Sequence, residues 1–466
     1  MATKITTAYA SEIDKTTRLE PRFFYNQSLL KKSFDDYGFE ELNSFTNLKS
    51  GSTPEHFEKK ENKDDFYFIK SADIKRYNLN FATISFVSKD VHNSRKKFKV
   101  IPNDVLLSNT GKYLGFACLV PSKIKEATTN QNIVRIRLKE KTETKFNPFF
   151  ILSFLNSVFG QIEIESLLTL TGQKYLNMEK FREFKIPKID EKEIKIISEK
   201  TKIIIDNEIE SISILEKAQN LFYQKLSIDF SIIKKEKDYS VNLSEFSEDD
   251  LWTPAFSYPL YVNTLKAIQK KWQTVPLREI ATIKKGDEVG SDNYNKYLDK
   301  KDSDVPFVRT TDLVNYEADQ FPDFYIPEEI YQELKQDIRA DDILFNNDGK
   351  IGLVAMLTSQ DKVIIQSHIR RLRLKPEAKK YNLTPEYLFL VLTIREVAGY
   401  QAERYTVIQS TIPTISNRLF DFKIPILDKN SIDEITKLVK GAFELKDEKK
   451  RLTKEVREEI DNYFGI

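Results

Sequence analysis

The stretch Phe184-Lys-Ile-Pro-Lys-Ile-Asp190, with the run that follows it from about Glu191 to Lys235, decides the fold. Apolar residues recur in this run at steps of three and four, which places them on one face of a helix. They are Ile194, Ile197, Ile204, Ile205, Ile209, Ile212, Leu215, Ala218, Phe222 and Leu226, interrupted by the hydroxyl of Thr201. The run contains no Pro or Gly and predicts a helix of about 65 Å. A helix of that length needs a long partner to bury its apolar face.

The partner is predicted at the other end of the chain. Phe422-Lys-Ile-Pro-Ile-Leu-Asp428 repeats the first phrase 238 positions later (422 − 184) and precedes a second heptad-like run. We interpret the two helices as the same element of a duplicated unit, paired antiparallel. Two unrelated amphipathic helices are the alternative, which the wider repetition disfavours. The residues expected to pair the helices are Ile205, Ile209, Ile212, Leu215, Phe222, Ile435, Val439, Ala442, Leu452 and Val456.

Composition limits the class of protein. The 466 residues exceed one ordinary core, so two or more domains are expected. The 73 basic and 71 acidic residues give a net charge of +2, which argues against an overall basic protein but allows local basic faces. Cys118 is the only cysteine, so an internal disulfide and a cysteine-based zinc cluster are excluded. No secretory segment and no membrane-spanning run of roughly 18 apolar residues is recognisable, which predicts a cytoplasmic protein.

The repetition extends beyond the helices. Phe68–Ile74 matches Phe307–Leu313, and both patterns are typical of a strand entering a turn whose Asp binds nearby backbone. The strongest match is between Asp104–Lys112 and Asp342–Lys350, each followed by a second glycine and an apolar strand. This pattern predicts a β-hairpin in each copy, with glycines that allow positive φ.

Each copy then continues in the same order. A strand alternating basic and apolar residues is followed by an apolar helix opened by proline, a polar loop and a long helix. The matched pairs are Arg135–Lys139 with Arg371–Lys375, Phe149–Phe159 with Glu386–Val397, and Gly172–Tyr175 with Ile408–Thr411. Residues up to Thr17 are expected to be a loose arm, and Lys234–Asp250 a linker.

The sequence therefore predicts an α+β fold in four parts. A first mixed β/α domain covers residues 1–190, and a central long helix covers 191–235. A linker and the second mixed β/α domain cover 236–428, and a C-terminal long helix covers 429–466. The two domains are expected to be separated by the antiparallel helices as a coiled-coil spacer, with an approximate two-fold relation.

These features together resemble the specificity (S) subunit of type I restriction–modification systems, over nearly the whole chain from Arg18. The resemblance rests on their order and on the following segments: Leu19-x-Pro-x-x-x-Tyr25, Lys49–Pro54, Asp104–Lys112, the loops at Gln173 and Gln409, and Phe-Lys-Ile-Pro before each helix. The second copy departs from the pattern at Gly286–Gly290, and its opening lacks the charged residues of the first.

The resemblance implies that each domain is a target recognition domain reading one half of a bipartite, asymmetric double-stranded DNA site. It implies that the paired helices dock two methyltransferase subunits, and that restriction or translocase subunits join the complex. Methyltransferase, ATPase and endonuclease activities then belong to partner subunits, which bind S-adenosylmethionine, ATP and Mg. This chain is expected to bind no cofactor.

The residues themselves also favour a chain without catalysis. Gly111-Lys112 and Gly349-Lys350 lack the upstream glycine of a phosphate-binding loop. The Asn/Asp-Pro-Pro-aromatic run of adenine methyltransferases is missing from the sequence. His56, His92 and His368 are scattered and form no local metal-ligand pair. A self-contained nuclease or methylase is therefore the least favoured interpretation.

DNA contacts are predicted at the turns, the polar loops and one basic cluster. Polar side chains there can bond base edges in the major groove, and Lys, Arg and hydroxyl groups can bind phosphates. The predicted residues are Lys70, Ser71, Arg95, Lys96, Lys97, Ser108, Asn109, Thr110, Lys112, Tyr113, Gln173, Lys174, Arg309, Thr310, Thr311, Asn346, Asn347, Asp348, Lys350, Tyr405, Gln409 and Ser410. The alternative is that the Asn, Asp and Gly residues build the turns and that the tyrosines pack internally. A duplicated protein–protein scaffold without DNA readout is the alternative function.

Overall fold

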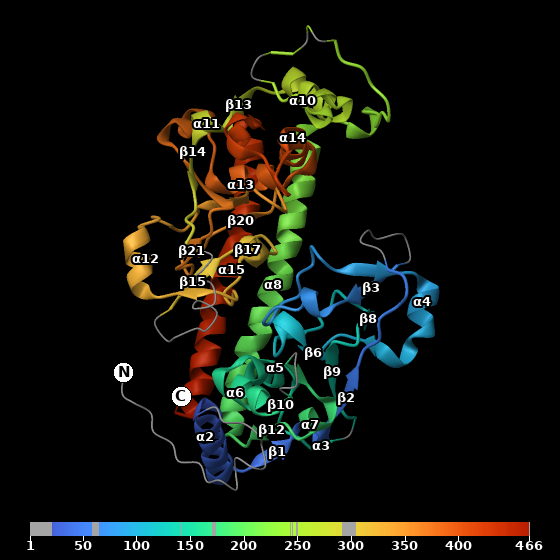
Figure 1. The fold of residues 1–466 in the computed structure, drawn as a ribbon, viewed down its shortest axis with the longest axis vertical. Coiled ribbons are helices and arrows are strands. Elements are labelled where there is room, and N and C mark those ends of the chain that lie inside the picture. Colours follow the sequence, from blue (N-terminus) through green and yellow to red (C-terminus); the bar gives the residue numbers. More distant parts are fainter. Residues whose placement is uncertain are drawn as a thin grey trace. The chain divides into compact units, whose positions relative to one another are not determined.

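The computed structural model describes residues 21–57, 65–140, 142–169, 174–242, 244, 246–247, 250–290 and 304–465. The chain divides into two compact units, the first made of Met1–Ile209 with Glu448–Ile466 and the second of Glu210–Asp447. Two long helices, α8 (Glu191–Leu226) and α15 (Lys429–Tyr463), contribute residues to both units (Figure 1). The arm expected up to Thr17 and the loop residue Gln173 lie outside the described residues.

Both long helices form, and the first is shorter than expected. α8 has 36 residues and α15 has 35, so α8 is about 54 Å long at 1.5 Å per residue. The helix expected to continue to Lys235 is wrong beyond Leu226, because Ser227 adopts a left-handed conformation with φ of +52°. A short 3-10 turn at Phe230–Ile232 follows. The described residues from Ile233 to Asp250 contain no α-helix or β-strand, as expected for a linker.

Polar contacts join α8 to α15 within each unit, and in the first unit their order is antiparallel. Residues with higher numbers in α8 contact residues with lower numbers in α15, which confirms the expected antiparallel pairing. In the first unit the pairs are Lys200 with Glu455 (3.4 Å) and Glu459, Asn207 with Glu448 (2.9 Å), and Glu208 with Lys449 (2.6 Å). In the second unit Lys225 Nζ lies 3.0 Å from Glu434 Oε1.

The apolar faces of the two helices are buried. Among the ten residues expected to pair the helices, Ile209 is half-buried and the others are buried. In the second unit, Leu215 and Phe222 share one core cluster with Ile435 and Val439. Thr201, which interrupts the stripe, bonds Ser153 of α5 (Pro148–Asn156) through their hydroxyl groups, whose oxygens lie 2.5 Å apart. The Thr201 hydroxyl also donates to Ile197 O of its own helix at 2.7 Å, so both of these contacts satisfy it.

The central sheet of each unit has the same strand order, which confirms the duplication. The first unit has β2-β9-β6-β7 and the second has β14-β22-β19-β20, with antiparallel neighbours throughout. Their bounds are Thr46–Ser50 (β2), Ile133–Leu138 (β9), Val105–Ser108 (β6), Ala117–Leu119 (β7), Ala281–Lys285 (β14), Ile369–Leu374 (β22), Ile343–Asn346 (β19) and Val354–Met356 (β20). The expected hairpins are β6–β7 and β19–β20. Their turn glycines Gly111, Gly115, Gly349 and Gly352 have φ between +70° and +88°, as predicted.

A buried aspartate at the start of each hairpin is held by an arginine of the neighbouring strand. Arg137 Nε and Nη2 each donate to a different oxygen of Asp104 at 2.6 Å. Arg373 makes the same bidentate contact with Asp342 at 2.6 and 2.7 Å. Charge-assisted bidentate bonds of this kind are strong and directional. They fix β6 against β9 and β19 against β22, the strands in which basic and apolar residues alternate.

The second repeated phrase also forms the turn expected from it. Lys70 N donates to Asp73 Oδ2 at 2.8 Å, and Arg309 N donates to Asp312 Oδ2 at 2.9 Å. The strands before these turns, β3 and β15, each pair in parallel with a strand later in the same unit, β8 or β21. Bounds in these two sheets are Ser85–Val87 (β4), Phe66–Ile69 (β3), Ala127–Thr129 (β8), Lys99–Val100 (β5), Tyr325–Ile326 (β18), Val305–Val308 (β15) and Ile364–Ile365 (β21).

The Phe-Lys-Ile-Pro phrases are short strands that end each β/α region just before a long helix. β12 (Lys185–Pro187) pairs antiparallel with β1 (Phe39–Glu41). β25 (Lys423–Pro425) pairs in the same way with β13 (Thr274–Pro276). The segments that open and close each copy are therefore joined by backbone hydrogen bonds.

The apolar helices begin at proline as predicted, but they end earlier than expected. α5 covers Pro148–Asn156, because Ser157 is extended and caps α6 (Val158–Ser166) by accepting from Gly160 N. α13 covers Pro385–Thr393. Other bounds are Pro21–Tyr37 (α2), Leu42–Phe45 (α3), Lys89–Ser94 (α4), Met178–Arg182 (α7), Pro254–Ser257 (α9), Pro259–Lys271 (α10), Leu277–Ile280 (α11), Glu328–Leu334 (α12), Tyr400–Tyr405 (α14), Leu313–Val314 (β16) and Glu317–Ala318 (β17).

Candidate nucleic-acid interface

In the first unit, the hairpin turn lies beside a short two-stranded ribbon. The ribbon consists of β10 (Leu168–Thr169) and β11 (Tyr175–Leu176). Leu176 N donates to Asn109 O at 2.9 Å, and Thr110 forms an isolated β-bridge with Tyr175. The structure therefore brings the predicted turn together with the end of the predicted polar loop.

The turn residues of the first unit differ in their access to solvent. Lys112 and, on the ribbon side, Lys174 are exposed, whereas Asn109, Thr110 and Tyr113 are half-buried. Ser108 is fully buried, and its hydroxyl donates to Thr110 O at 3.4 Å. The DNA contact expected for Ser108 is replaced by a turn-building contact, because a fully buried hydroxyl cannot reach a base edge.

The basic cluster of the first unit is attached to a different loop. Arg95 Nη1 donates to Ser52 Oγ at 2.7 Å and to Ser52 O at 3.1 Å. Lys96 and Lys97 are exposed beside it. Lys70 is half-buried and donates to Ser85 Oγ at 2.6 Å, so its ammonium group is already bonded within the unit. Ser71, the next residue, is half-buried.

In the second unit, Asn346 builds the hairpin turn. Its Nδ2 donates to Asp348 O at 2.9 Å and to Lys350 O at 2.6 Å, and its Oδ1 accepts from Thr310 Oγ1 at 2.9 Å. Asn346 and Asn347 are fully buried. Their expected DNA contacts are therefore corrected to turn-building roles, the alternative that the sequence left open. The bond from Thr310 also ties the segment with Arg309 and exposed Thr311 to this turn.

Asp348 is the centre of the polar network in this turn. Its carboxylate accepts from Asn347 Nδ2 at 3.1 Å and from the Thr414 hydroxyl, and it lies 3.0 Å from His368 Nδ1. Burial alone would raise the pKa of Asp348, but the bonds from Thr414, His368 and Asn347, with the charge of Arg370, hold that pKa below its ordinary value. Asp348 is therefore an ionised acceptor that positions its neighbours.

The same turn is bonded to the ribbon formed by β23 (Val407–Gln409) and β24 (Ile412–Thr414). Gly349 N donates to Pro413 O at 2.8 Å, and Ile415 N donates to Asn347 O at 3.3 Å. Lys350, Gln409 and Ser410 are exposed on these two elements. The structure thus brings together the two segments predicted for the second copy, as it does in the first unit.

Tyr405 does not belong to this surface. Its ring is buried and stacks on Phe422 with 6.0 Å between the ring centroids. Burial raises the pKa of Tyr405. The DNA contact expected for Tyr405 is therefore corrected to core packing, the alternative stated for the tyrosines.

Sequence reasoning missed three residues of the second interface. His368 and Thr414 hold Asp348, and Ile412 is exposed at the ribbon tip. His368 lies 20 positions from Asp348 and Thr414 lies 66 positions away, so no local pattern joins them. The signal that could have indicated Ile412 is its place in a polar loop, where an apolar residue has no core to fill.

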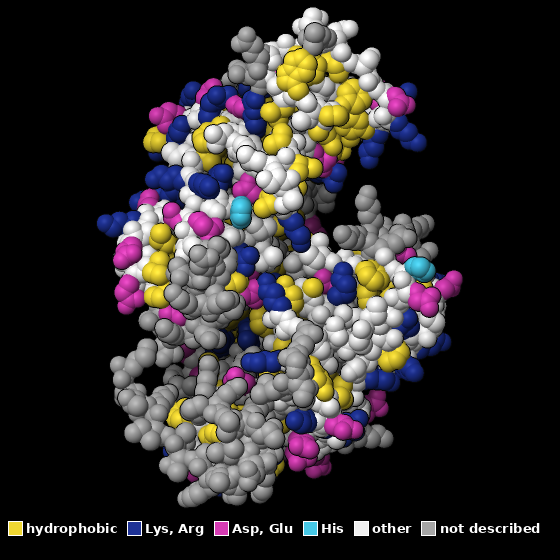
Figure 2. Space-filling view, viewed as in Figure 1, with side chains coloured by type: hydrophobic (Ala, Val, Ile, Leu, Met, Phe, Trp, Pro, Cys, Tyr) yellow, Lys and Arg dark blue, Asp and Glu magenta, His cyan; other side chains and the backbone are white. Residues whose placement is uncertain are grey.

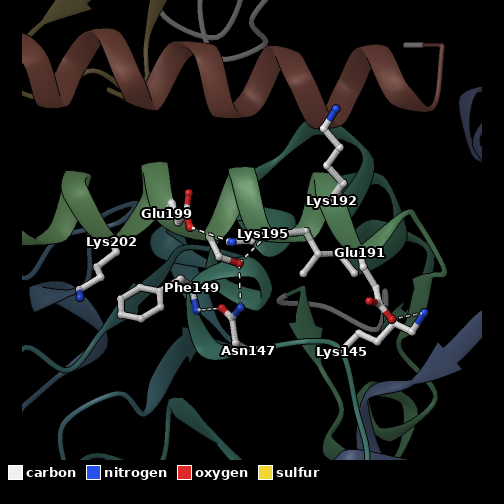
Figure 3. Close-up of a pocket in the computed structure, with 10 residues that line it drawn as sticks. Lys145, Asn147, Phe149, Glu191, Lys192, Lys195, Glu199 and Lys202 are labelled. Carbon is white, nitrogen blue, oxygen red and sulfur yellow. Dashed lines mark hydrogen bonds and ion pairs between the residues drawn. The ribbon is translucent and has the colours of Figure 1, made fainter.

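A separate groove of about 810 Å³ lies at the start of α8 in the first unit (Figure 3). Lys145 pairs with Glu191 at 2.6 Å, and Asn147 donates to Ser198 Oγ at 2.8 Å. These contacts attach the segment before α5 to the long helix. The groove is lined by Lys145, Asn147, Phe149, Glu191, Lys192, Ile194, Lys195, Ser198, Glu199 and Lys202.

Charged side chains of both signs are spread over the described part of the face in Figure 2. Figure 2 shows Lys and Arg side chains intermixed with Asp and Glu, in keeping with the net charge of +2. Among the described residues, no group of three or more His, Cys, Asp or Glu side chains could hold a metal ion. A search of the same residues for a helix long and apolar enough to cross a membrane found none.

The fold and its two turn-and-ribbon sites define a duplicated α+β protein with long paired helices. The family model described as the type I restriction modification DNA specificity domain matches residues 35–219 and again 269–456. The chain therefore belongs to this family and carries its domain twice. It is a DNA-recognition subunit of a type I restriction–modification system, and its partners are DNA and other subunits of that complex.

Solved structures of such subunits are also similar to the chain. The S subunit of a type I restriction-modification system from M. genitalium is 14% identical, with a TM-score of 0.35, over 92% of this chain and 94% of that one. The HsdS subunit from Thermoanaerobacter tengcongensis is 13% identical, with a TM-score of 0.29, over 91% of this chain and 96% of that one. Comparison with curated proteins found no match.

Proposed function

We propose that each compact unit reads one half of a bipartite, asymmetric DNA site through its hairpin turn and the adjoining ribbon. One observation supports this assignment above the others. In each unit a backbone N–H at the end of the ribbon's second strand, from Leu176 in β11 or from Ile415 just after β24, donates to the carbonyl of the turn asparagine, Asn109 or Asn347. Each arrangement lies inside one of the two matched ranges, 35–219 and 269–456. A duplicated scaffold without DNA readout is set aside because the repeated domain is a DNA specificity domain.

The exposed groups of each interface suit the two kinds of DNA contact. Lys112 and Lys174 in the first unit, and Lys350 in the second, place ammonium groups where they can neutralise phosphates. Exposed Gln409, Ser410 and Thr311 offer donors and acceptors to base edges. The buried Asn346 and the half-buried Asp348 hold the hairpin turn and the β23–β24 ribbon in place through their hydrogen bonds. Such support fixes the geometry that base readout requires.

The paired helices are proposed to dock two methyltransferase subunits. Ile203 on α8 is 41% exposed, and a partner subunit that covered this apolar side chain would remove it from water. Methyltransferase, ATPase and endonuclease activities, with S-adenosylmethionine, ATP and Mg, are assigned to partner subunits, and restriction or translocase subunits are expected among them. This chain supplies the recognition and no catalytic residue.

The first experiment maps methylated adenines in a host with and without this chain. We expect methylation at one bipartite sequence that disappears when the chain is deleted. Unchanged methylation, or a single continuous recognition sequence, would contradict the proposal.

A second experiment assigns each half-site to a unit. Cys118 is the only cysteine, and it is fully buried, with a pKa that burial raises. Lys112→Cys and Lys350→Cys can therefore each be labelled with an iron chelate that cleaves nearby DNA. In the complex with its methyltransferase subunits, the two labels should cleave at opposite half-sites. Cleavage by both labels at the same half-site would count against the proposal, and the unsubstituted chain is the matched control.

A further inference from the structure

The tip of the β23–β24 ribbon exposes apolar side chains that have no core to fill. Five consecutive residues, 408–412, are exposed. Ile408 is 74% exposed and Ile412 is 46% exposed, in a ribbon that otherwise carries polar residues at its tip. Large exposed aliphatic side chains in water-facing loops commonly mark a surface that a partner covers.

The pairing register gives each face of the ribbon a different character. Gln409 lies directly opposite Ile412, and Ile408 lies opposite Pro413. Side chains alternate between the faces of a strand, so Gln409 and Ile412 share one face, and Ile408 lies on the other. Residues paired in this way have Cβ atoms about 5 Å apart. One face therefore presents an amide and an aliphatic group side by side.

The ribbon is also held in a fixed position on the turn. Gly349 N donates to Pro413 O at 2.8 Å, and the Thr414 hydroxyl bonds the carboxylate of Asp348. Lys350, the residue after Gly349, is exposed next to this attachment. A positive charge thus accompanies the exposed ribbon tip, which favours a nucleic acid as the covering partner over an apolar protein surface.

A two-stranded ribbon fits into the major groove of B-DNA, and the chemistry of the Gln409 face matches one base pair. An A·T pair presents there the N7 acceptor and N6 donor of adenine together with the C5-methyl group of thymine. A glutamine amide can donate to N7 and accept from N6, and an aliphatic side chain can pack on the methyl group. A G·C pair offers no methyl group to Ile412.

We propose that the β23–β24 ribbon enters the major groove and reads an A·T base pair, with Gln409 bonding adenine and Ile412 packing on the thymine methyl group. This inference rests on the proposed function and names the base pair that this part of the second unit recognises. Lys350 binds a backbone phosphate beside it. Ile408, on the opposite face, does not contact the same thymine.

The test uses the full complex with its methyltransferase subunits and a duplex carrying the mapped site. Each thymine of the half-site assigned to the second unit is replaced in turn by deoxyuridine, which removes only the methyl group. At one position the dissociation constant should rise about fourfold, the effect of one buried methyl group. Ile412→Ala should cause a similar loss on the natural duplex and no further loss with deoxyuridine at that position.

Two further variants test the contact to adenine and control for the loss of an aliphatic side chain. Gln409→Ala should weaken binding at least about fivefold on the natural duplex and remove the sensitivity to 7-deazaadenine in the same base pair. Ile408→Ala is the matched control, because it removes the same atoms from the other face. It should keep the full effect of deoxyuridine at the Ile412 position, and the same coupling for Ile408 would overturn the assignment.

Other outcomes separate this inference from the function on which it rests. If binding is sequence-specific but no A·T pair couples to both Gln409 and Ile412, this inference fails and the proposed function stands. If these variants weaken assembly with the methyltransferase subunits without changing DNA affinity, a protein covers the ribbon and the inference is also refuted. If the intact complex has no sequence preference, the proposed function itself fails.

Discussion

Removing one partner of a buried ion pair between the two long helices should lower the free energy of unfolding far more than replacing both partners by apolar residues. In the first unit, Glu208 Oε2 lies 2.6 Å from Lys449 Nζ, and the two side chains are only 4% and 2% exposed. Taking each ion out of water costs several kcal/mol, which offsets most of their mutual attraction. If Lys449→Met removes the cation alone, a buried carboxylate remains. We expect a loss of about 3–5 kcal/mol in the free energy of unfolding.

The double replacement distinguishes this reasoning from simple loss of a contact. Glu208→Leu should destabilise by a similar amount, because it leaves the Lys449 ammonium group buried. The free energy of unfolding of the double variant Glu208→Leu, Lys449→Met should lie within about 1 kcal/mol of that of the original chain or exceed it, because neither charge of the pair is left buried without the other. Urea denaturation followed by the helical circular dichroism signal measures all four chains.

An exposed pair on the same helix supplies the control. Lys195 and Glu199 are one turn apart on α8 and are 77% and 65% exposed. Lys195→Met should cost no more than about 0.5 kcal/mol, because exposed pairs of this spacing contribute little. The reasoning would be refuted if Lys449→Met were as mild as Lys195→Met. It would also be refuted if the double variant lost the sum of the two single losses.

Three further predictions concern pH, the hairpin clamp and two glycines. Burial raises the pKa of Glu163 well above 4.5. The stability that the protonated Glu163 side chain contributes is therefore present below pH 4.5 and is lost as the pH rises towards its folded-state pKa. In urea denaturation, Glu163→Gln should be more stable than the original chain at pH 8 but not at pH 4. Arg373→Leu should cost about 3 kcal/mol in thermal unfolding, because it leaves the Asp342 carboxylate buried. Gly286→Ala should destabilise by roughly 2 kcal/mol, because its Cβ would lie 2.3 Å from Gln366 O. Gly441→Ala, inside α15 with nothing within 4 Å, should instead stabilise by about 1 kcal/mol in the same melting experiment.

The repeated elements could be predicted from the sequence because their patterns are local. The Phe-Lys-Ile-Pro strands, the hairpins and the proline-opened helices all depend on neighbours within a few positions. The same dependence on local pattern makes the sequence predict α-helix beyond Leu226, where the described residues up to Lys235 have none. Neither Pro nor Gly occurs between Ser227 and Lys235, and the turn at Ser227 carries no sequence signal. Serine rarely adopts the left-handed conformation seen there.

The interface itself could be predicted only in part. The Asp342–Lys350 phrase correctly located the turn, but the sequence could not tell which of its polar residues face inward. Asn346 is buried because its amide closes the turn and meets Thr310, a residue 36 positions earlier. The sequence gives no sign that His368 belongs to this site, yet the fold places it beside Asp348. Such long-range contacts follow from strand order, which the residue patterns of single strands do not specify.

The contrast between the two copies explains how one fold can serve two different readings. The buried supports are repeated almost unchanged, as in the Arg137–Asp104 and Arg373–Asp342 clamps. The ribbons differ, because β10 and β11 pair Thr169 with Tyr175, whereas β23 and β24 pair Gln409 with Ile412. A side chain at the ribbon end can change without disturbing the core, because the turn holds the ribbon through backbone bonds. Recognition can therefore diverge between the copies while the clamps preserve the shape of each unit.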